Sequence, residues 1–339
     1  MRPKRRTEAN CPMLHIHNGD STAETAKKTN LPGEHLAWRE ALVCGPAPGH
    51  LAEEDFLKMR AAHLAQSYGV RFEKCEAELR AQHRALRTFS DHEEVVLWFE
   101  HDLFCQVHLM YLLDWFAQRE LGQTRLSLIC VGDFPGLEIF HGLGQLNEQQ
   151  LSSLFPDRKE VTAAQMQLAS EAWRAYSAVD ALALISLLKT DLSALPFLDA
   201  ALRKHLQRFP STRNGLGRVE NAGLELIANG YHKFKSLFPA FTRNESEYGF
   251  GDAQLYLELK RLANAPNPFL VNGGNSTLDP ARIFLSSFEL TARGAAALEG
   301  KEDFIAQNGI DEWLGGIHLK GSEAAWRWDD DTQQLLVSL

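Results

Sequence analysis

The residues best suited to chemistry are three adjacent ionisable residues, Glu100, His101 and Asp102, which directly follow an apolar run. Carboxylate oxygens bind divalent cations, and an imidazole titrates near neutral pH. We expect all three to be catalytic, with His101 as general acid or base, and we expect Glu100, Asp102 and Asp20 to hold a divalent metal, Mg, Mn or Zn. The alternative is that Asp102 caps the following helix, which accounts for one of the three residues.

Further polar residues follow the other predicted strands, at 13–17, 34–38 and 126–131. The carboxyl ends of parallel strands meet at one edge of an open sheet, and such sheets bind ligands there. Several carboxylates at this edge would raise one another's pKa unless a metal or Arg39 supplied positive charge. We therefore predict a site for a small anionic or nucleotide-like ligand. Its ligand-binding residues are Asn18, Gly19, Asp20, Ser21, Arg39, Glu40, Asp133, His141 and, from the second half, Arg213, which binds the anion together with Arg39.

Three local motifs around this edge carry weaker signals. The loop at 18–22 joins a strand to a helix, so its amides could bind a phosphate or carboxylate group, but it lacks the lysine of a Walker loop. His15 and His17 lie on one strand face, a spacing that zinc sites use, although a buried, hydrogen-bonded pair is the favoured interpretation. Cys105 precedes apolar helix positions and is expected to pack in the core.

The elements that position these residues alternate along the first half of the chain. Short apolar runs are separated by stretches whose apolar residues recur at helical spacing, such as 51–89 and 103–118. This alternation predicts an α/β fold, with a Rossmann-like open parallel sheet domain over 13–155. The dinucleotide fingerprint GxGxxG is missing from the sequence.

The second half, 156–339, is predicted to be mainly helical. Within it, at about 196–300, helices are followed by a hairpin with a turn-rich connection at 272–277 and a closing helix, which is a winged-helix-like order. A small C-terminal hairpin is rich in tryptophan, with Trp313, Trp326 and Trp328. These rings are expected to seal a small core.

Basic residues gather in one part of the second half. Eight Lys and Arg stand against two Glu at 203–243, so DNA is a candidate partner there. The helix at 252–263, which would enter a DNA groove, is apolar and offers few groups that could read bases. This favours packing of that helix against protein.

The composition is that of a globular protein of two domains, with 339 residues, 45% hydrophobic and 23% charged. A net charge of −9 excludes bulk coating of nucleic acid. Five dispersed cysteines without a CxxC pair exclude a disulfide framework and a structural zinc ribbon. Residues 1–12 are expected to be a disordered leader, since no apolar signal segment follows them, and no run of about 18 apolar residues occurs. We expect a cytoplasmic protein without a membrane partner.

Several motifs resemble the bacterial domain-of-unknown-function family 1835, whose members are uncharacterised. The resemblance rests on Leu14-His-Ile-His-Asn-Gly-Asp-Ser21, on Trp38-Arg-Glu-Ala-Leu42 with Gly45-Pro46, and on Val95-Val-Leu-Trp-Phe-Glu-His-Asp-Leu103 with Gln106. It continues through 141–145, 209–215 and 308–318. The family has no established activity, so the resemblance implies none. Because the motifs lie in both halves, it implies a site between the halves, with Arg213 and His318 facing the carboxylate edge.

The clustered carboxylates favour an enzyme, whereas the basic residues at 203–243 favour a regulator. We expect a metal-dependent hydrolase or transferase that acts on a phosphorylated or nucleotide-like ligand at the carboxyl edge of the sheet. The alternative is a ligand-sensing regulator whose winged-helix domain contacts DNA or a transcription partner.

Overall fold

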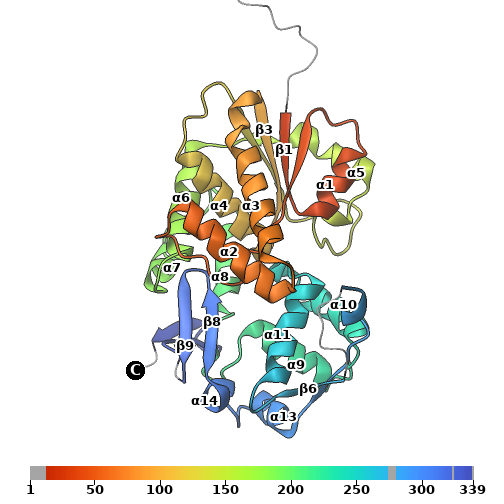
Figure 1. Cartoon of the computed structure of the whole chain (residues 1–339), viewed down its shortest axis with the longest axis vertical. Coiled ribbons are helices and arrows are strands. Elements are labelled where there is room, and N and C mark those ends of the chain that lie inside the picture. The colour runs from red at the N-terminus through yellow and green to blue at the C-terminus, as the bar shows by residue number, and fades with distance from the viewer. Residues whose placement is uncertain (1–12, 274–279, 323, 338–339) are drawn as a thin grey trace, which may run out of the picture.

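The computed structural model describes residues 13–273, 280–322 and 324–337 of the chain. The predicted leader at 1–12 and most of the connection at 272–277 lie outside the described residues. Figure 1 shows a part built around a sheet, which contains the first half of the chain, and a second part of helices and small hairpins below it. Among the described residues, no helix has both the length and the apolar character needed to cross a lipid bilayer.

A five-stranded sheet forms the centre of the first half. Its strands are β1 (Met13–Asn18), β2 (Glu34–Trp38), β3 (Glu94–Glu100), β4 (Arg125–Val131) and β5 (Lys159–Glu160). Their order is β2-β1-β3-β4-β5, and the first four are parallel, while β5 adds a short antiparallel edge. The α/β class and the parallel sheet predicted from the apolar runs are therefore confirmed.

Different helices cover the two faces of this sheet, because side chains alternate along each strand. The helices of this part are α1 (Asp20–Lys27), α2 (Glu53–Tyr68), α3 (Phe72–Arg87), α4 (Leu103–Ala117) and α5 (Glu148–Ser153), with short 3-10 turns η1 (Phe89–Asp91), η2 (Leu143–Gln145) and η3 (Phe155–Asp157). On β3, Val95 and Leu97 join the large core with α2, α3 and α4, whereas Val96 and Trp98 face a smaller core under α1. Burial on both faces explains the continuous apolar run.

The second half is mainly helical. Its helices are α6 (Ala163–Tyr176), α7 (Leu182–Leu187), α8 (Leu198–Leu206), α9 (Arg218–Ala228), α10 (Phe234–Asn244), η4 (Ser246–Tyr248), α11 (Asp252–Asn264), α12 (Pro280–Ile283), α13 (Ala292–Leu298) and α14 (Phe304–Asn308). α6 and α8 pack on α4, and β5 belongs to the sheet. The chain beyond the predicted boundary at 155 thus still contributes to the core of the first half.

The helices α9, α10 and α11 precede a two-stranded antiparallel hairpin, β6 (Leu270–Asn272) and β7 (Phe288–Leu290). An isolated bridge between Lys233 and Ser287 adds the segment before α10 to this hairpin. On α11, Leu255, Leu259 and Leu262 recur at helical spacing and are fully buried, and Leu259 packs at Gly223 of α9. The other face of α11 therefore points away from this core.

The C-terminal tryptophans lie in two hairpins rather than in one. The first hairpin consists of β8 (Ile310–Leu314) and β9 (Ile317–Gly321), and the second of β10 (Trp326–Asp329) and β11 (Gln334–Val337). Trp326 and Trp328 are buried, as expected for core residues. Trp313 instead stacks on the His318 ring across the first hairpin, because the tight turn at 315–316 places the two side by side.

Candidate functional site

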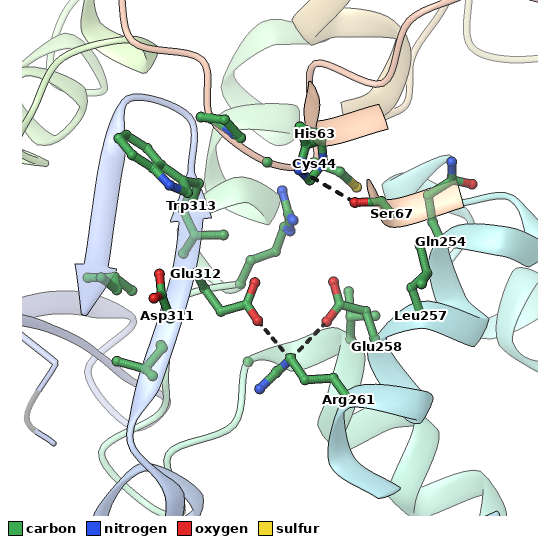
Figure 2. Close-up of a pocket in the computed structure, with 18 of the residues that line it drawn as sticks. Cys44, His63, Ser67, Gln254, Leu257, Glu258, Arg261, Asp311, Glu312 and Trp313 are labelled. Atoms are coloured by element: carbon green, nitrogen blue, oxygen red, sulfur yellow. Dashed lines mark hydrogen bonds and ion pairs between the residues drawn. The ribbon is translucent and has the colours of Figure 1, made fainter. Parts of the chain in front are cut away.

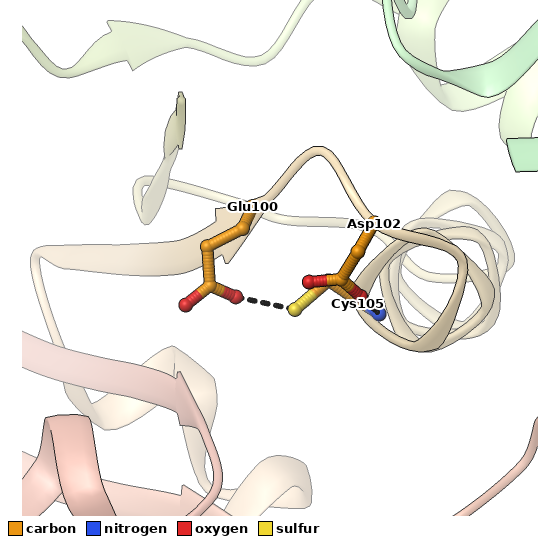
Figure 3. A group of neighbouring side chains, drawn as sticks. All are labelled: Glu100, Asp102 and Cys105. Carbon is orange, nitrogen blue, oxygen red and sulfur yellow. Dashed lines mark hydrogen bonds between the residues drawn. The ribbon is translucent and has the colours of Figure 1, made fainter. Parts of the chain in front are cut away.

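The strand order changes direction between β1 and β3, which is where open α/β sheets bind ligands. The predicted tripeptide lies at this point, at the end of β3. Glu100, Asp102 and Cys105 each bring one ligand atom into a group whose atoms all lie within 4.8 Å of one another. Figure 3 shows Glu100 at the strand end facing the start of α4, which carries the other two.

Hydrogen bonds inside this buried group satisfy most of its polar atoms. The Cys105 thiol donates to Glu100 Oε2, and the Leu143 amide donates to Glu100 Oε1 at 2.5 Å. Asp102 Oδ1 accepts from the Cys105 amide at 2.8 Å, so Asp102 is the N-cap of α4, as the alternative interpretation predicts. Asn18 donates to Cys105 Sγ at 2.6 Å. The group is therefore a closed network at the strand ends.

Burial favours the protonated forms of these acids. Loss of water, with Asp102 nearby, raises the pKa of Glu100 to about 8, and burial also raises the pKa of Asp102. The pKa of the Cys105 thiol lies well above its usual value for the same reason. At neutral pH Glu100 is therefore mainly a neutral acid that accepts one hydrogen bond from an amide, rather than a charged ligand-binding group.

Two neighbouring loops seal the group from solvent. Gly142, with φ of +119°, packs so closely that a Cβ there would lie 2.9 Å from Glu100 Oε1. From the second half, a Cβ on Gly249 would lie 2.1 Å from Asp102 Oδ1. A substrate therefore has no room beside the two carboxyl groups.

The structure does not bring the other predicted charges into this group. Asp20 is exposed and paired with Arg39, whose Nη2 lies 2.6 Å from its carboxylate. Glu40 is buried against Arg60 at 2.7 Å. Cys105, and not Asp20, is therefore the third donor beside Glu100 and Asp102.

The remaining predicted site residues are dispersed. Ser21 donates to the Gly144 carbonyl, and Gly19 is the N-cap of α1 without a side-chain bond. The His101 ring packs near Phe140 and Phe197. Asp133 and His141 are exposed.

The predicted contact between the two halves through Arg213 is not formed. Arg213 donates instead to the Leu298 carbonyl at the end of α13. His318, the other residue expected to face the edge, binds Asp311 at 2.6 Å within its own hairpin region. Both side chains satisfy neighbours in the second half, so neither reaches the Glu100 group.

The histidines of β1 are buried and hydrogen-bonded, which is the interpretation that the sequence favours. His15 Nε2 binds the Pro32 carbonyl and His17 Nε2 binds His35 Nδ1, both at 2.9 Å. Burial lowers the pKa of all three rings, so they are neutral at pH 7.

A large cavity of about 880 Å³ lies between the two halves, away from the predicted edge. We call it the inter-half cavity. Its walls come from the loop at 44–46 and α2, from the segment at 208–220, from α11 and from β8. Figure 2 shows α2 above the cavity, with α11 and β8 on opposite sides. The exposed face of α11 therefore faces another part of the same chain.

Carboxyl groups from two walls of this cavity pair with the same arginine. Arg261 Nε lies 3.1 Å from Glu312 Oε1 of β8 and 3.5 Å from Glu258 Oε2 of its own helix (Figure 2). Arg261 also ion-pairs with Glu220 of α9. Burial, together with Glu258 and Glu220, raises the pKa of Glu312 to about 7, although Arg261 opposes this shift. Burial also raises the pKa of Glu220.

Neutral polar groups line the opposite end of the cavity. His63 and Ser67 lie one turn apart on α2, with 3.5 Å between Nδ1 and Oγ. His63 Nε2 is buried without a hydrogen-bond partner among the described residues. Burial lowers the pKa of His63 to about 4, so its ring is a neutral acceptor or donor at pH 7.

Sequence reasoning missed this cavity. Glu258 and Arg261 lie on the helix interpreted as an apolar packing helix, and Glu312 comes some fifty residues later in the chain. The one available signal was the i, i+3 spacing of Glu258 and Arg261, which is common on solvated helix faces. No family model and no curated protein matches the sequence, so the resemblance to family 1835 stays a prediction.

Proposed function

We propose that the protein is a hydrolase or a transferase that acts on a small molecule bound in the inter-half cavity. The observation that carries this proposal is the pair of carboxyl groups from opposite walls, Glu258 and Glu312, which share Arg261 (Figure 2). Two carboxyl groups in one cavity can serve as general acid and general base for cleaving a bond whose leaving group needs a proton. The cavity volume also suits a small-molecule ligand.

The two carboxyl groups take different roles in this proposal. Glu312, with a pKa of about 7, still holds its proton in about half of the molecules at neutral pH and gives it to the leaving group. Glu258 takes a proton from the attacking water or acceptor hydroxyl. Arg261 fixes both groups, and Glu220 holds Arg261 from the other side. Glu312 loses one proton and Glu258 gains one in each reaction. The starting state returns when a proton passes from Glu258 to Glu312 through solvent.

A panel of 4-nitrophenyl glycosides, esters and phosphates tests this proposal by release of 4-nitrophenol. We expect turnover of at least one class, a loss of about 100-fold or more in Glu312→Gln and Glu258→Gln, and a rate that falls above pH of about 7 as Glu312 loses its proton. Glu225→Gln, at a half-buried glutamate of α9 that pairs with Arg218 and does not line the cavity, is the matched control and should keep full activity. Turnover that survives both cavity substitutions would refute the proposal.

A divalent metal remains a second proposal, for the Glu100 group. Two carboxyl groups and a thiol within 4.8 Å of one another form a donor set that suits zinc better than magnesium, because of the sulfur. A bound ion would have to displace the protons of Glu100 and Cys105, and the sealed surroundings favour a structural role over a catalytic one. Thermal unfolding of EDTA-treated protein with added Zn²⁺, Mn²⁺ or Mg²⁺ tests this.

The metal proposal requires a rise in melting temperature with one of these ions that is absent in Asp102→Asn and in Cys105→Ser. Asp133→Asn, an exposed carboxylate at the end of the neighbouring strand, is the control and should respond like the natural chain. Equal responses in all variants would show that the ion binds elsewhere.

The winged-helix interpretation of α9 to α13 also belongs to the proposals. The helix order and the Lys233–Ser287 bridge, which adds a third short strand, support it. Two observations favour the enzyme over a DNA-binding regulator. The helix that would read DNA, α11, faces the inter-half cavity, and Arg203, Lys204 and Arg218 of the basic segment are each paired with a carboxylate.

A cytoplasmic location completes the proposal. Cys44, Cys75, Cys105 and Cys130 are free thiols, which agrees with a reducing compartment.

A further inference from the structure

Arg208 is a buried arginine in the wall of the inter-half cavity. Only 9% of its surface is exposed. Its guanidinium group donates one hydrogen bond, from Nη1 to the Val43 carbonyl, and lies 5.3 Å from the centre of the Phe250 ring. Among the described residues, no carboxylate lies within ion-pair distance of it. A guanidinium group has five N–H donors, so most of those of Arg208 have no acceptor among the described residues.

Arg60, which is fully buried, shows how a buried arginine can be paired, although its Nε has no partner among the described residues. Arg60 pairs with Glu40 at 2.7 Å and also donates to three backbone carbonyls, those of Ala41, Cys44 and Pro46. Burying a charge costs several kcal/mol unless such partners replace water. Arg208 lacks the carboxylate and faces a cavity instead, so an anion in the cavity would complete its surroundings.

The amino end of a helix lies beside Arg208. The backbone of Arg208 packs on Gly217, where an added Cβ would lie 2.4 Å from the Arg208 carbonyl oxygen. Gly217 is the N-cap of the 11-residue helix α9 and lines the same cavity, and a Cβ there would also lie 2.8 Å from Glu220 Oε2. The amino end of a helix favours anions, and here the Glu220 carboxylate already lies beside it, so Arg208 itself is the group that would bind a further anion.

Burial lowers the pKa of Arg208, but nearby groups, Glu258 and Glu220 among them, raise it overall, so the cavity carboxylates stabilise its charge from a distance without an ion pair among the described residues. Glu220, Glu258 and Glu312 all contact Arg261. Asp311 binds His318 and Lys320. Each acidic side chain of the cavity therefore already has a cationic partner other than Arg208.

We propose that Arg208 binds the anionic group, a carboxylate or a phosphate, of the ligand that occupies the inter-half cavity. This inference rests on the proposed function for the identity of the site and adds the substrate class, a small acid. It also replaces the predicted anion-binding pair, since Arg39 is held by Asp20 and Arg213 by a backbone carbonyl. The acidic group would anchor the substrate at Arg208, next to the reacting pair at Glu258 and Glu312.

Thermal unfolding of the full chain with inorganic phosphate or with succinate tests this, against sodium chloride at equal ionic strength. We expect at least one of the two anions to raise the melting temperature by about 2–5 °C through mass action. The rise should vanish in Arg208→Gln and shrink in Arg208→Lys, because lysine keeps the charge but not the planar fork of donors. Arg203→Gln, an exposed arginine of α8 paired with Asp199, is the control and should respond fully.

A response to phosphate alone points to a phosphorylated ligand, and a response to succinate alone to a carboxylic acid. No response of the natural chain to either anion, or equal responses in all variants, would overturn the proposal. If Arg208→Gln does not fold, Arg208→Lys is the deciding variant. An undiminished rise in melting temperature in Arg208→Lys would also overturn the proposal. Glu312→Gln should keep the anion response whatever its turnover, so failure of anion binding and failure of the proposed catalysis are separate results.

Discussion

Glu100 is the residue at which burial has its clearest consequence. The unfolded chain loses this proton near pH 4.5, whereas the folded chain keeps it to about pH 8. Between these values the folded state binds more protons than the unfolded state, so the free energy of unfolding falls as pH rises. This contribution is fully present below pH 4.5 and is lost above pH 8.

Replacing Glu100 by Gln should remove this pH dependence. The amide keeps an oxygen for the Leu143 N–H and cannot ionise. Urea unfolding at pH 6 and pH 8 should show that the natural chain loses about 2 kcal/mol more than the variant over this interval. Glu225→Gln, at a half-buried site, should behave like the natural chain, and parallel pH profiles for all three proteins would contradict a raised pKa at Glu100.

The buried pair of Arg60 and Glu40 gives a second prediction at this scale. Arg60→Met should lower the free energy of unfolding by about 3–5 kcal/mol, because Glu40 is left as a buried charge without its partner. Arg39→Met removes the same kind of pair, with Asp20, at an exposed site and should cost less than about 1 kcal/mol. Denaturant unfolding of both variants measures the difference, and equal losses would show that Glu40 is not held by Arg60.

At the scale of elements, the sequence predicts those structural features that depend only on residues close together in the chain. The continuous apolar run of β3 and the N-cap of α4 place Glu100 and Asp102 at one strand end, and both features are local. The sealing of that end depends on Leu143 and Gly249, which come from distant loops. Leu143 lies in the motif at 141–145, but nothing in that motif shows which strand end it covers. Glu258 and Glu312 likewise meet only because β8 packs opposite α11. No spacing of residues along the sequence predicts such a long-range contact.

The contact of η4 with the start of α4 can be tested through one glycine. Gly249 has φ of +64°, and a Cβ there would lie 2.1 Å from Asp102 Oδ1 and 2.9 Å from Phe104 Cβ. Gly249→Ala should therefore cost about 3 kcal/mol or more of folding free energy, since strain and steric overlap add. Gly230→Ala meets open space at φ of +93° and should cost only the strain, about 1 kcal/mol. Equal losses in thermal or urea unfolding would mean that η4 does not press on the Glu100 group.

At the scale of the whole molecule, histidines with lowered pKa values are spread over both halves of the chain. Burial is the main cause that lowers the pKa of seven of them, in both halves of the chain: His15, His17, His35, His63, His83, His108 and His205. Each ring takes up a proton near pH 6.5 when the chain unfolds, and at a lower pH when the chain is folded. Their contribution to stability is therefore present above pH 6.5 and is lost as the pH falls toward the folded values.

We accordingly expect stability to peak near pH 6.5 to 7, between the losses caused by the histidines on the acid side and by Glu100 on the alkaline side. Each histidine adds up to about 1.4 kcal/mol of lost stability per pH unit below 6.5, so the acid limb should be the steeper one. Urea unfolding from pH 5 to pH 9 measures both limbs. His205 is fully buried, and neither ring nitrogen has a hydrogen-bond partner in the part of the chain that the structure describes. His205→Leu should therefore flatten the acid limb by about one proton, whereas His141→Gln, at an exposed site, should leave it unchanged. A profile that is flat between pH 5 and pH 6.5 would mean that these histidines are accessible to protons in the folded chain, and the packing of both halves would have to be looser than their burial implies.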